Sequence, residues 1–179
     1  MKTKTLLLSA MVFLFFQSCK MENTPEEYFD ITTLNTNIFF EFGSRDFKRM
    51  QLDKKGGQLM AFDDKSTFVA KSYEDHILRF KIPYLQQAID KIKDLKPTDE
   101  TATMINASLD LFNFVKKIYQ TDYLKTARLM DQNVSQEEID KGILKIDTDN
   151  IPEFDRRYKK LRDLALPYAE KHGIKVKNF

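Results

Sequence analysis

Cysteine, tryptophan, glycine and proline are all scarce in this chain, and each scarcity removes a class of protein. Among 179 residues there are one cysteine, no tryptophan, five glycines and five prolines. A single cysteine excludes an internal disulfide framework and any metal cluster held by cysteines alone. So few glycines and prolines argue against an all-β sandwich, a glycine-rich nucleotide fold and a collagen-like protein. With 42% hydrophobic and 31% charged residues, the composition fits one globular domain, or at most two very small ones.

The start of the chain has the pattern of a secretory signal peptide. Lys2 and Lys4 give a short basic start, and residues 6–16 form an uncharged, mostly apolar run. The run is too short to span a membrane, which takes about 20 apolar residues. Interpreted instead as a core helix, it would have no polar face. We therefore predict that residues 1–18 are a targeting segment rather than part of the fold.

Cys19 makes this targeting prediction more specific. The sequence F-Q-S-C at 16–19 resembles the lipobox of bacterial lipoproteins, with Ser18 as the small residue, although the two residues before it are uncommon choices. The resemblance implies that a diacylglyceryl group is attached to the Cys19 thiol, that the chain is cut just before Cys19, and that the new amino terminus is acylated. Lys20 stands where many such bacteria place an Asp for inner-membrane retention, so the resemblance implies the outer membrane. The alternative is an ordinary secreted protein with one free thiol.

The charge balance changes once this segment is removed. The whole chain has 29 Lys and Arg against 27 Asp and Glu, a net charge of +2. Loss of Lys2 and Lys4 leaves 27 residues of each sign, so the basic excess belongs to the predicted signal peptide. So balanced a chain is unlike a typical nucleic-acid-binding protein, and no nucleic-acid partner is expected. Residues 19–24 would then be a lipidated tether, and residues 25–179 the folded domain.

Apolar residues recur at helical spacing in four segments of residues 25–179. The first segment follows a T-P-E-E capping box at 24–27 and ends at the glycine pair 56–57. The second covers about 64–95, and the third runs from about 98 to 130. Short polar joints separate the segments. The sequence therefore predicts an all-α protein, built as a single bundle of about four helices.

The fourth segment carries two further start signals and an expected interruption. S-Q-E-E at 135–138 is a second capping box, and N-I-P-E at 150–153 resembles a third. The sequence therefore predicts a last arm that is broken near 147–150. The arm should end at Gly173, because glycine suits the left-handed conformation that follows many helices.

Two short stretches carry a second, more diffuse resemblance. The aromatic-rich F-V-K-K-I-Y at 114–119 and the closing P-Y-A-E-K-H-G-I at 167–174 are similar to the C-terminal half of small, uncharacterised helical surface lipoproteins of bacteria. The similarity covers residues 111–176. It implies a helical fold and an envelope location, and it brings no catalytic role with it.

Residues 58–84 allow a second interpretation with strands. Apolar residues alternate as in a β-strand between Leu78 and Tyr84, and residues 58–62, after two glycines, could begin a hairpin. The helical pattern extends further along the chain and therefore favours a helix. Pro83 should bend that helix, because it removes a backbone donor and crowds the preceding turn.

Residues that could hold a metal are few and badly spaced. The only histidines are His76 and His172, and neither has the glutamate three residues earlier that a di-iron bundle needs. His172 continues an apolar stripe and is expected at the edge of the core, satisfied by a hydrogen bond. A calcium loop at 147–155 would need glycine where Pro152 stands. Nucleophile, phosphate-binding and haem motifs are also missing, so we expect no catalytic residue, metal or cofactor.

These patterns indicate a location more clearly than a biochemical task. We expect a lipid-anchored, non-enzymatic interaction or structural module at the outer membrane, on its periplasmic face or at the cell surface. Its partner would be an envelope protein or an anionic lipid or glycan. The 15 phenylalanines could instead line a pocket, so the alternative is a periplasmic carrier of a lipid or other apolar ligand. A degradative or metal-dependent enzyme is a third hypothesis, which clustered buried carboxylates would favour.

Basic residues near the end of the chain are candidates for an anionic contact. Residues 122–155 are rich in acid, and the residues from 156 onward are rich in base. On one interpretation the basic side chains pair with the acidic segment and add little net stability. On the other they form a patch for lipid or glycan phosphates. The residues of this predicted patch are Arg156, Arg157, Lys159, Lys160 and Lys171.

Overall fold

The computed structural model describes residues 23–63 and 66–176 and is mostly helical. Its helices, in chain order, are α1 (Pro25–Thr33), the 3-10 helix η1 (Leu34–Phe39), α2 (Ser44–Lys55), α3 (Tyr73–His76), the π-helix η2 (Ile77–Lys81), α4 (Ile82–Lys93), α5 (Ala102–Ile118), the π-helix η3 (Tyr119–Tyr123), α6 (Leu124–Asp131) and α7 (Gln136–Lys171). Strands β1 (Met60–Phe62) and β2 (Thr67–Val69) pair as a small antiparallel sheet. The all-α expectation is confirmed at this coarse level.

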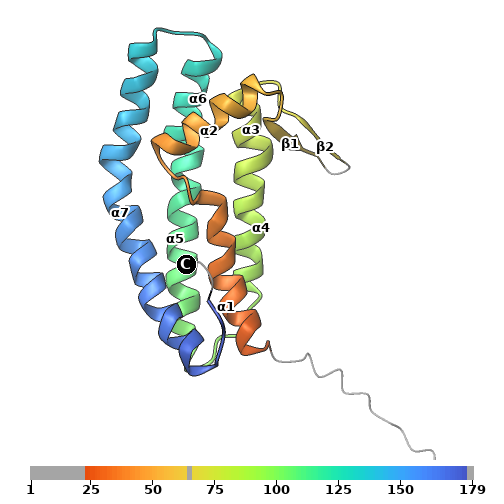
Figure 1. Ribbon diagram of the computed structural model, residues 1–179, viewed down its shortest axis with the longest axis vertical. Coiled ribbons are helices and arrows are strands. Elements are labelled where there is room, and N and C mark those ends of the chain that lie inside the picture. Colours follow the sequence, from red (N-terminus) through yellow and green to blue (C-terminus); the bar gives the residue numbers. More distant parts are fainter. Residues whose placement is uncertain (1–22, 64–65, 177–179) are drawn as a thin grey trace, which may run out of the picture.

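Long helical arms pack side by side along the molecule (Figure 1). α5 contacts both α4 and α7, and α1 packs against all three. η3 and α6 continue the line of α5 and also contact α7. α2 lies obliquely near one end of this group, and the β1–β2 hairpin projects beside it (Figure 1). The end that carries α2 and the hairpin is therefore opposite the end at which α1 begins.

The predicted capping box at 24–27 is confirmed, and of the one at 135–138 the cap by Ser135 is confirmed. Thr24 Oγ1 accepts from the backbone N–H of Glu27 at 3.2 Å, and Glu27 Oε2 accepts from the N–H of Thr24 at 2.9 Å. Ser135 Oγ accepts from the N–H of Glu138 at 3.3 Å and starts α7. After the end of α7, Gly173 has a φ of +67°, as expected for a residue that follows a helix. These local signals correctly indicate the start of α1 and both ends of α7.

The predicted break near 147–150 is wrong. α7 runs without interruption through 36 residues, and Asn150 is buried inside it rather than capping a new helix. Pro152 removes one backbone hydrogen bond, but a continuous helix keeps Ile146 and Leu161 fully buried. Burial of this face of α7 therefore outweighs the local cost of the proline.

The first predicted segment is divided rather than continuous. α1 gives way to η1, and the chain then turns at Gly43 into α2. Thr32 and Thr33, at the end of α1, donate from their hydroxyls to the carbonyls four residues earlier, at 2.7 and 2.6 Å. Such bonds compete with helical hydrogen bonding and often bend a helix. The regular part of this arm accordingly ends at the threonines.

Residues 58–84 combine both interpretations of the sequence. The β1–β2 hairpin is present, as the alternative predicted, and follows Gly57, whose φ is +68°. The helix expected before Tyr73 is replaced by this hairpin. The alternating stretch from Leu78 to Tyr84 lies on η2 and α4, so this part is helical, as the longer pattern indicated.

Aromatic rings fill the interior between η1, α5 and α7. Phe42 stacks on Tyr123 and on Phe154, with ring centroids 5.6 and 4.8 Å apart. Phe39 meets Phe112 edge-on at 4.9 Å. Offset and edge-on pairs of this kind stabilise a core beyond the area that they bury. These rings are packed against one another in the core.

Candidate functional site

The backbone turn at Gly43 sets the start of α2 and the position of Asp46. Gly43 has a φ of +97°, which other residues rarely adopt, and a Cβ there would lie 2.9 Å from Ile151 Cδ1 of α7. Asp147 of α7 accepts from the Ser44 N–H at 2.8 Å and so caps α2 from another helix. Asp46 is thereby held, buried, in the first turn of α2.

A buried carboxylate lies at the centre of the candidate site. The side chain of Asp46 is only 3% exposed, and its Oδ1 accepts from Lys81 Nζ at 2.8 Å. Its Oδ2 accepts from the hydroxyl of Tyr119, which is fully buried. A buried charge is costly unless it is paired and hydrogen-bonded, and here both carboxylate oxygens have partners. Asp46, Lys81 and Tyr119 are called the Asp46 triad below.

Tyr119 and Tyr123 form a closely packed pair beside the triad. Their ring centroids are 4.1 Å apart, and Tyr123 Oη accepts from the Gly43 N–H at 2.6 Å. Burial raises the pKa of both phenols well above its usual range, and the charge of Asp46 raises it further. Both hydroxyls therefore stay protonated near neutral pH, so they can donate hydrogen bonds and cannot act as bases.

Two π-helical turns bring these side chains together. η2 carries Lys81 and η3 carries both tyrosines, and the two turns are in contact. η2 comes just before Pro83, whose missing N–H and bulky ring disfavour an ordinary α-helical turn. The Ile82 N–H bonds instead to the carbonyl of Ile77, five residues earlier, and this wider turn accommodates the proline. The proline expected to bend the helix thus produces a π turn, a feature frequent at functional sites.

An open cleft of about 320 Å³ leads from the surface to Asp46 and Lys81. One part of its lining comes from α2, and a second part comes from β1, α3 and η2. A third part comes from η1 and the turn that follows η1. The volume is at the small end of the range of about 300–1,000 Å³ that small-molecule sites span. We call it the Asp46 cleft, and its lining residues are Asn37, Ile38, Phe40, Glu41, Asp46, Arg49, Met50, Asp53, Gln58, Met60, His76, Phe80 and Lys81.

His76, in the lining of this cleft, is held in one tautomer. Its Nδ1 is 2.6 Å from the Met60 carbonyl oxygen, and because a carbonyl can only accept, Nδ1 carries the proton. Burial lowers the pKa of His76, so the ring is neutral near pH 7 and Nε2 is an acceptor. The ring also stacks on Phe80, with centroids 5.1 Å apart. His76 therefore lines the cleft as a neutral ring whose acceptor is Nε2.

The sequence alone gives little sign of this site. Asp46 is 35 residues from Lys81 and 73 residues from Tyr119, so no local spacing connects the three. One weak signal is Lys81 itself, a cation among apolar residues just before Pro83. A single charge on a helix is usually solvated, so this signal would not have distinguished the site without the fold.

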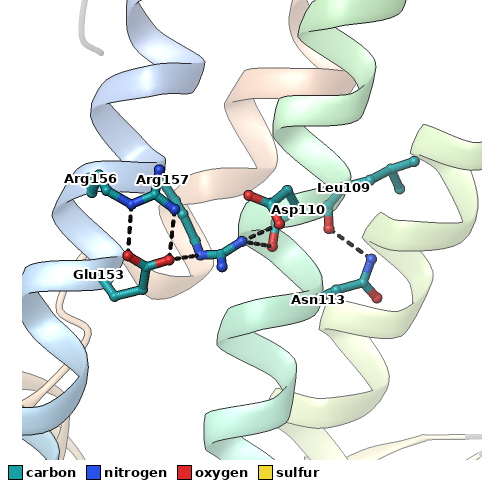
Figure 2. Close-up of polar contacts among 6 residues, drawn as sticks. All are labelled: Leu109, Asp110, Asn113, Glu153, Arg156 and Arg157. Carbon is teal, nitrogen blue, oxygen red and sulfur yellow. Dashed lines mark hydrogen bonds and ion pairs between the residues drawn. The ribbon is translucent and has the colours of Figure 1, made fainter.

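The two arginines of the predicted anionic patch are paired with carboxylates. Arg156 contacts the two carboxylate oxygens of Glu153, each at 2.7 Å (Figure 2). Arg157 contacts Glu153 at 2.8 Å and also contacts Asp110 of α5 (Figure 2). The arginines, Arg156 first, lower the pKa of Glu153 to about 2. Glu153 therefore carries a full negative charge between them at neutral pH.

The three lysines of the predicted patch differ in their surroundings. Lys159 pairs with Asp163, and Lys171 pairs with Glu100 at 2.9 Å. Among the described residues no acidic side chain forms an ion pair with Lys160. Lys171 lies eleven residues beyond Lys160, about 17 Å along the helix at 1.5 Å per residue, and so does not join the other four residues. The anionic patch stays a prediction, which salt-sensitive binding to anionic vesicles would test.

Apart from Cys19, the other candidate residues of the sequence lie where a helix or a hydrogen bond accounts for them. His172 Nε2 lies 2.9 Å from Glu100 Oε1, which confirms the expected hydrogen bond. The acidic residues of 147–155 lie along α7 rather than on a loop, so they lack the geometry of a calcium loop. In the described part of the chain, no group of three or more His, Cys, Asp or Glu is arranged to hold a metal ion. Cys19 and the predicted signal peptide lie outside the described residues.

Comparison with known proteins adds no family to this description. No protein-family model, curated protein or solved structure gives a significant match to the chain. Of the helices within residues 23–63 and 66–176, none is long and apolar enough to cross a membrane. A function is therefore inferred from the Asp46 cleft together with the N-terminal sequence.

Proposed function

We propose that this protein is a non-enzymatic binding module, held at the outer membrane by acyl chains on Cys19, with the Asp46 cleft as its binding surface. One observation carries the proposal: two charged groups of the cleft, the buried Asp46 and the largely buried Lys81, hold each other in place. Lys81 contacts Asp46 at 2.8 Å, and Arg49 contacts Asp53 at 3.5 Å. Side chains that are already fixed lose little conformational freedom when a ligand binds.

The chemistry of the lining supports binding over catalysis. No serine, threonine or cysteine is among the described residues that line the cleft, so the usual side-chain nucleophiles are missing there. Lys81 is engaged by Asp46, and the pKa of Tyr119 is raised, mainly by burial. His76 Nε2 can accept a hydrogen bond but has no hydroxyl or thiol in this lining to activate.

The packing supports a binding module over a carrier of apolar ligands. The rings of Phe39, Phe42 and Phe112 are buried and pack against other rings of the core. The Asp46 cleft, by contrast, is lined by five charged side chains in addition to His76. A cleft of that polarity suits a polar ligand better than a lipid chain.

The arrangement of the helices places most of the cleft lining at one end of the molecule. We take the fold as a bundle of four arms: α1 with η1, α3 with η2 and α4, α5 with η3 and α6, and α7. α1 begins at one end of the bundle, and α2 and the hairpin lie at the other (Figure 1). The nine residues of α1 and the six of η1 span about 25 Å along the bundle. An anchor before α1 would thus be attached at the end of the molecule opposite α2 and the hairpin, away from most of the cleft lining.

Fractionation of cells that express the full chain tests the anchor. We expect the wild-type chain in the outer membrane, because each buried methylene contributes about 0.8 kcal/mol and two or three acyl chains hold far more firmly than one. Cys19→Ser should move the chain into a soluble or uncleaved form. Ser18→Ala keeps a small residue before the cysteine and is the matched control, expected to fractionate like the wild type. Unchanged fractionation of Cys19→Ser would contradict the proposal.

A further inference from the structure

The charges of the Asp46 cleft nearly cancel. The cations Lys81 and Arg49 pair with Asp46 and Asp53, and Glu41 adds one more carboxylate to the lining. A phosphate group would therefore approach three carboxylates. A simple cation would find, among the described residues of the lining, only Glu41 without an ion pair. This balance disfavours a strongly charged ligand of either sign and favours a neutral one.

Hydrogen-bonding groups of both kinds are spread along the lining. Asn37 and Gln58 have side-chain amides that both donate and accept. Glu41 supplies a carboxylate, and His76 supplies an Nε2 whose acceptor role follows from the Nδ1 contact with the Met60 carbonyl. A hydroxyl group donates and accepts at once, so a ligand with several hydroxyls matches this mixture of groups.

Aromatic side chains lie beside these polar groups. The Phe80 ring is fixed between His76 and Tyr84, with centroids 5.1 and 6.3 Å away. Phe40 also lines the cleft, and 68% of this large apolar residue is exposed. A ligand with an apolar C–H face would remove part of the Phe40 ring from water. Sugar rings combine such a face with a rim of hydroxyls.

We infer that the Asp46 cleft binds a neutral saccharide, with one sugar ring against Phe40 and its hydroxyls bonded to Glu41, His76 Nε2 and the neighbouring amides. The inference rests on the proposed function, because it takes the same cleft as the binding surface. A volume of about 320 Å³ suits a monosaccharide or disaccharide unit, since larger ligands occupy the upper part of the usual range.

Titration calorimetry on the full wild-type chain tests this inference. The chain is purified in a zwitterionic detergent that has no sugar headgroup. The saccharide probes are glucose, galactose, N-acetylglucosamine, lactose and cellobiose, and the charged probes are sodium phosphate and putrescine. We expect saturable binding of at least one saccharide and of neither charged probe. Binding of no saccharide in this set, or saturable binding of phosphate or putrescine, would overturn the inference.

Two pairs of variants locate the bound saccharide. Phe40→Ala and Glu41→Gln should each weaken binding about tenfold, the loss typical of removing one good contact. Leu144→Ala and Glu137→Gln are the matched controls, because Leu144 is similarly exposed, at 64%, and both residues lie on α7 outside the cleft. Wild-type affinity in both cleft variants, or the same weakening in the control variants as in the cleft variants, would overturn the assignment to this cleft.

The state of Cys19 separates this inference from the proposed function. A chain that binds saccharide through the cleft but is not acylated would support the inference and contradict the anchor. A chain that is acylated but binds none of the saccharides would support the anchor and overturn the inference. Mass spectrometry of the same preparation used for calorimetry distinguishes these results.

Discussion

The Asp46 side chain illustrates how single residues determine the interior beside the cleft. Moving a carboxylate from water into the protein interior costs on the order of several kcal/mol, even after the protein relaxes around it. Lys81 Nζ and the Tyr119 hydroxyl offset this cost by contacting the two oxygens of Asp46. Because Lys81 is only 12% exposed, salt screens the pair weakly. The folded chain therefore depends on Lys81 to offset the cost of burying the charge of Asp46.

Lys81→Met should lower the free energy of unfolding by about 3–5 kcal/mol, because it leaves the Asp46 charge buried without its cation. Adding Asp46→Asn should recover much of this loss, since the amide oxygen still accepts from Tyr119 and no buried charge remains. Arg49→Met is the control: its side chain is 62% exposed, so losing the pair with Asp53 should cost less than about 1 kcal/mol. Denaturant unfolding measures all three, and a Lys81→Met chain as stable as the wild type would refute the coupling.

The free energy of unfolding should decrease as the pH falls through about 6.5, in part because of His76. Burial lowers the pKa of folded His76 below its ordinary value of 6.5, so the unfolded chain takes up a proton first. His76→Asn, whose amide can donate to the Met60 carbonyl, should make stability less sensitive to pH between about 5 and 7. Unfolding curves across that range check this result, with His172→Asn as the control. Identical pH dependence in the wild type and His76→Asn would show that His76 does not contribute.

At the scale of helices, the sequence indicates the ends that are determined locally and misses those that depend on another helix. The capping boxes at Thr24 and Ser135 satisfy their own first turns, so they are visible as short patterns. α3 has a local cap, because Ser72 Oγ accepts from the Asp75 N–H at 3.0 Å. The start of α2, by contrast, is capped by Asp147 of α7, and the Tyr73 N–H of α3 also donates to Asp131 of α6 at 2.9 Å. These partners lie far along the chain, and no local pattern identifies them.

The same limit explains how little of the candidate site could be predicted. Pro83 indicates a disturbed helix, but not that the resulting π turn carries Lys81 to Asp46. Asn150 and Pro152 have the spacing of a helix start, yet burial along α7 overrides that spacing. Periodicity predicts which residues are buried in helices, whereas the cleft exists only after α2, the hairpin and η2 have met.

Gly142 allows α6 and α7 to approach closely. A Cβ on Gly142 would lie 2.9 Å from Thr126 Oγ1, and Thr126 is buried and β-branched, so it cannot easily move. The higher helix propensity of alanine in Gly142→Ala should raise the free energy of unfolding by up to about 1 kcal/mol. Overpacking costs about 1–3 kcal/mol, so we expect a net loss of stability in denaturant unfolding.

The double variant Gly142→Ala/Thr126→Ala separates this clash from other effects. Removing the Thr126 hydroxyl makes room for the new methyl group, so the double variant should lose less stability than the two single variants added together. Simple additivity, or a Gly142→Ala chain more stable than the wild type, would show that α6 and α7 are not packed this closely.

At the scale of the whole molecule, the start of α1 and the elements that line most of the Asp46 cleft lie at opposite ends. α1 begins at the end remote from α2 and the hairpin (Figure 1). α5 and α7 pack against each other along the bundle and connect the two ends. If the chain is anchored before α1 as proposed, a ligand in the cleft would be held away from the lipid, where a neutral, water-soluble molecule is accessible. This separation of anchor and cleft is what the proposed binding module requires.

The proposed anchoring of this module is tested most directly by the intact mass of the protein extracted from outer membranes. We predict a chain that lacks residues 1–18, begins at Cys19, and carries the added mass of a diacylglyceryl group and an amide-linked acyl chain. A chain that retains residues 1–18, or that begins elsewhere with an unmodified Cys19 thiol, would contradict the anchor and with it the proposed function.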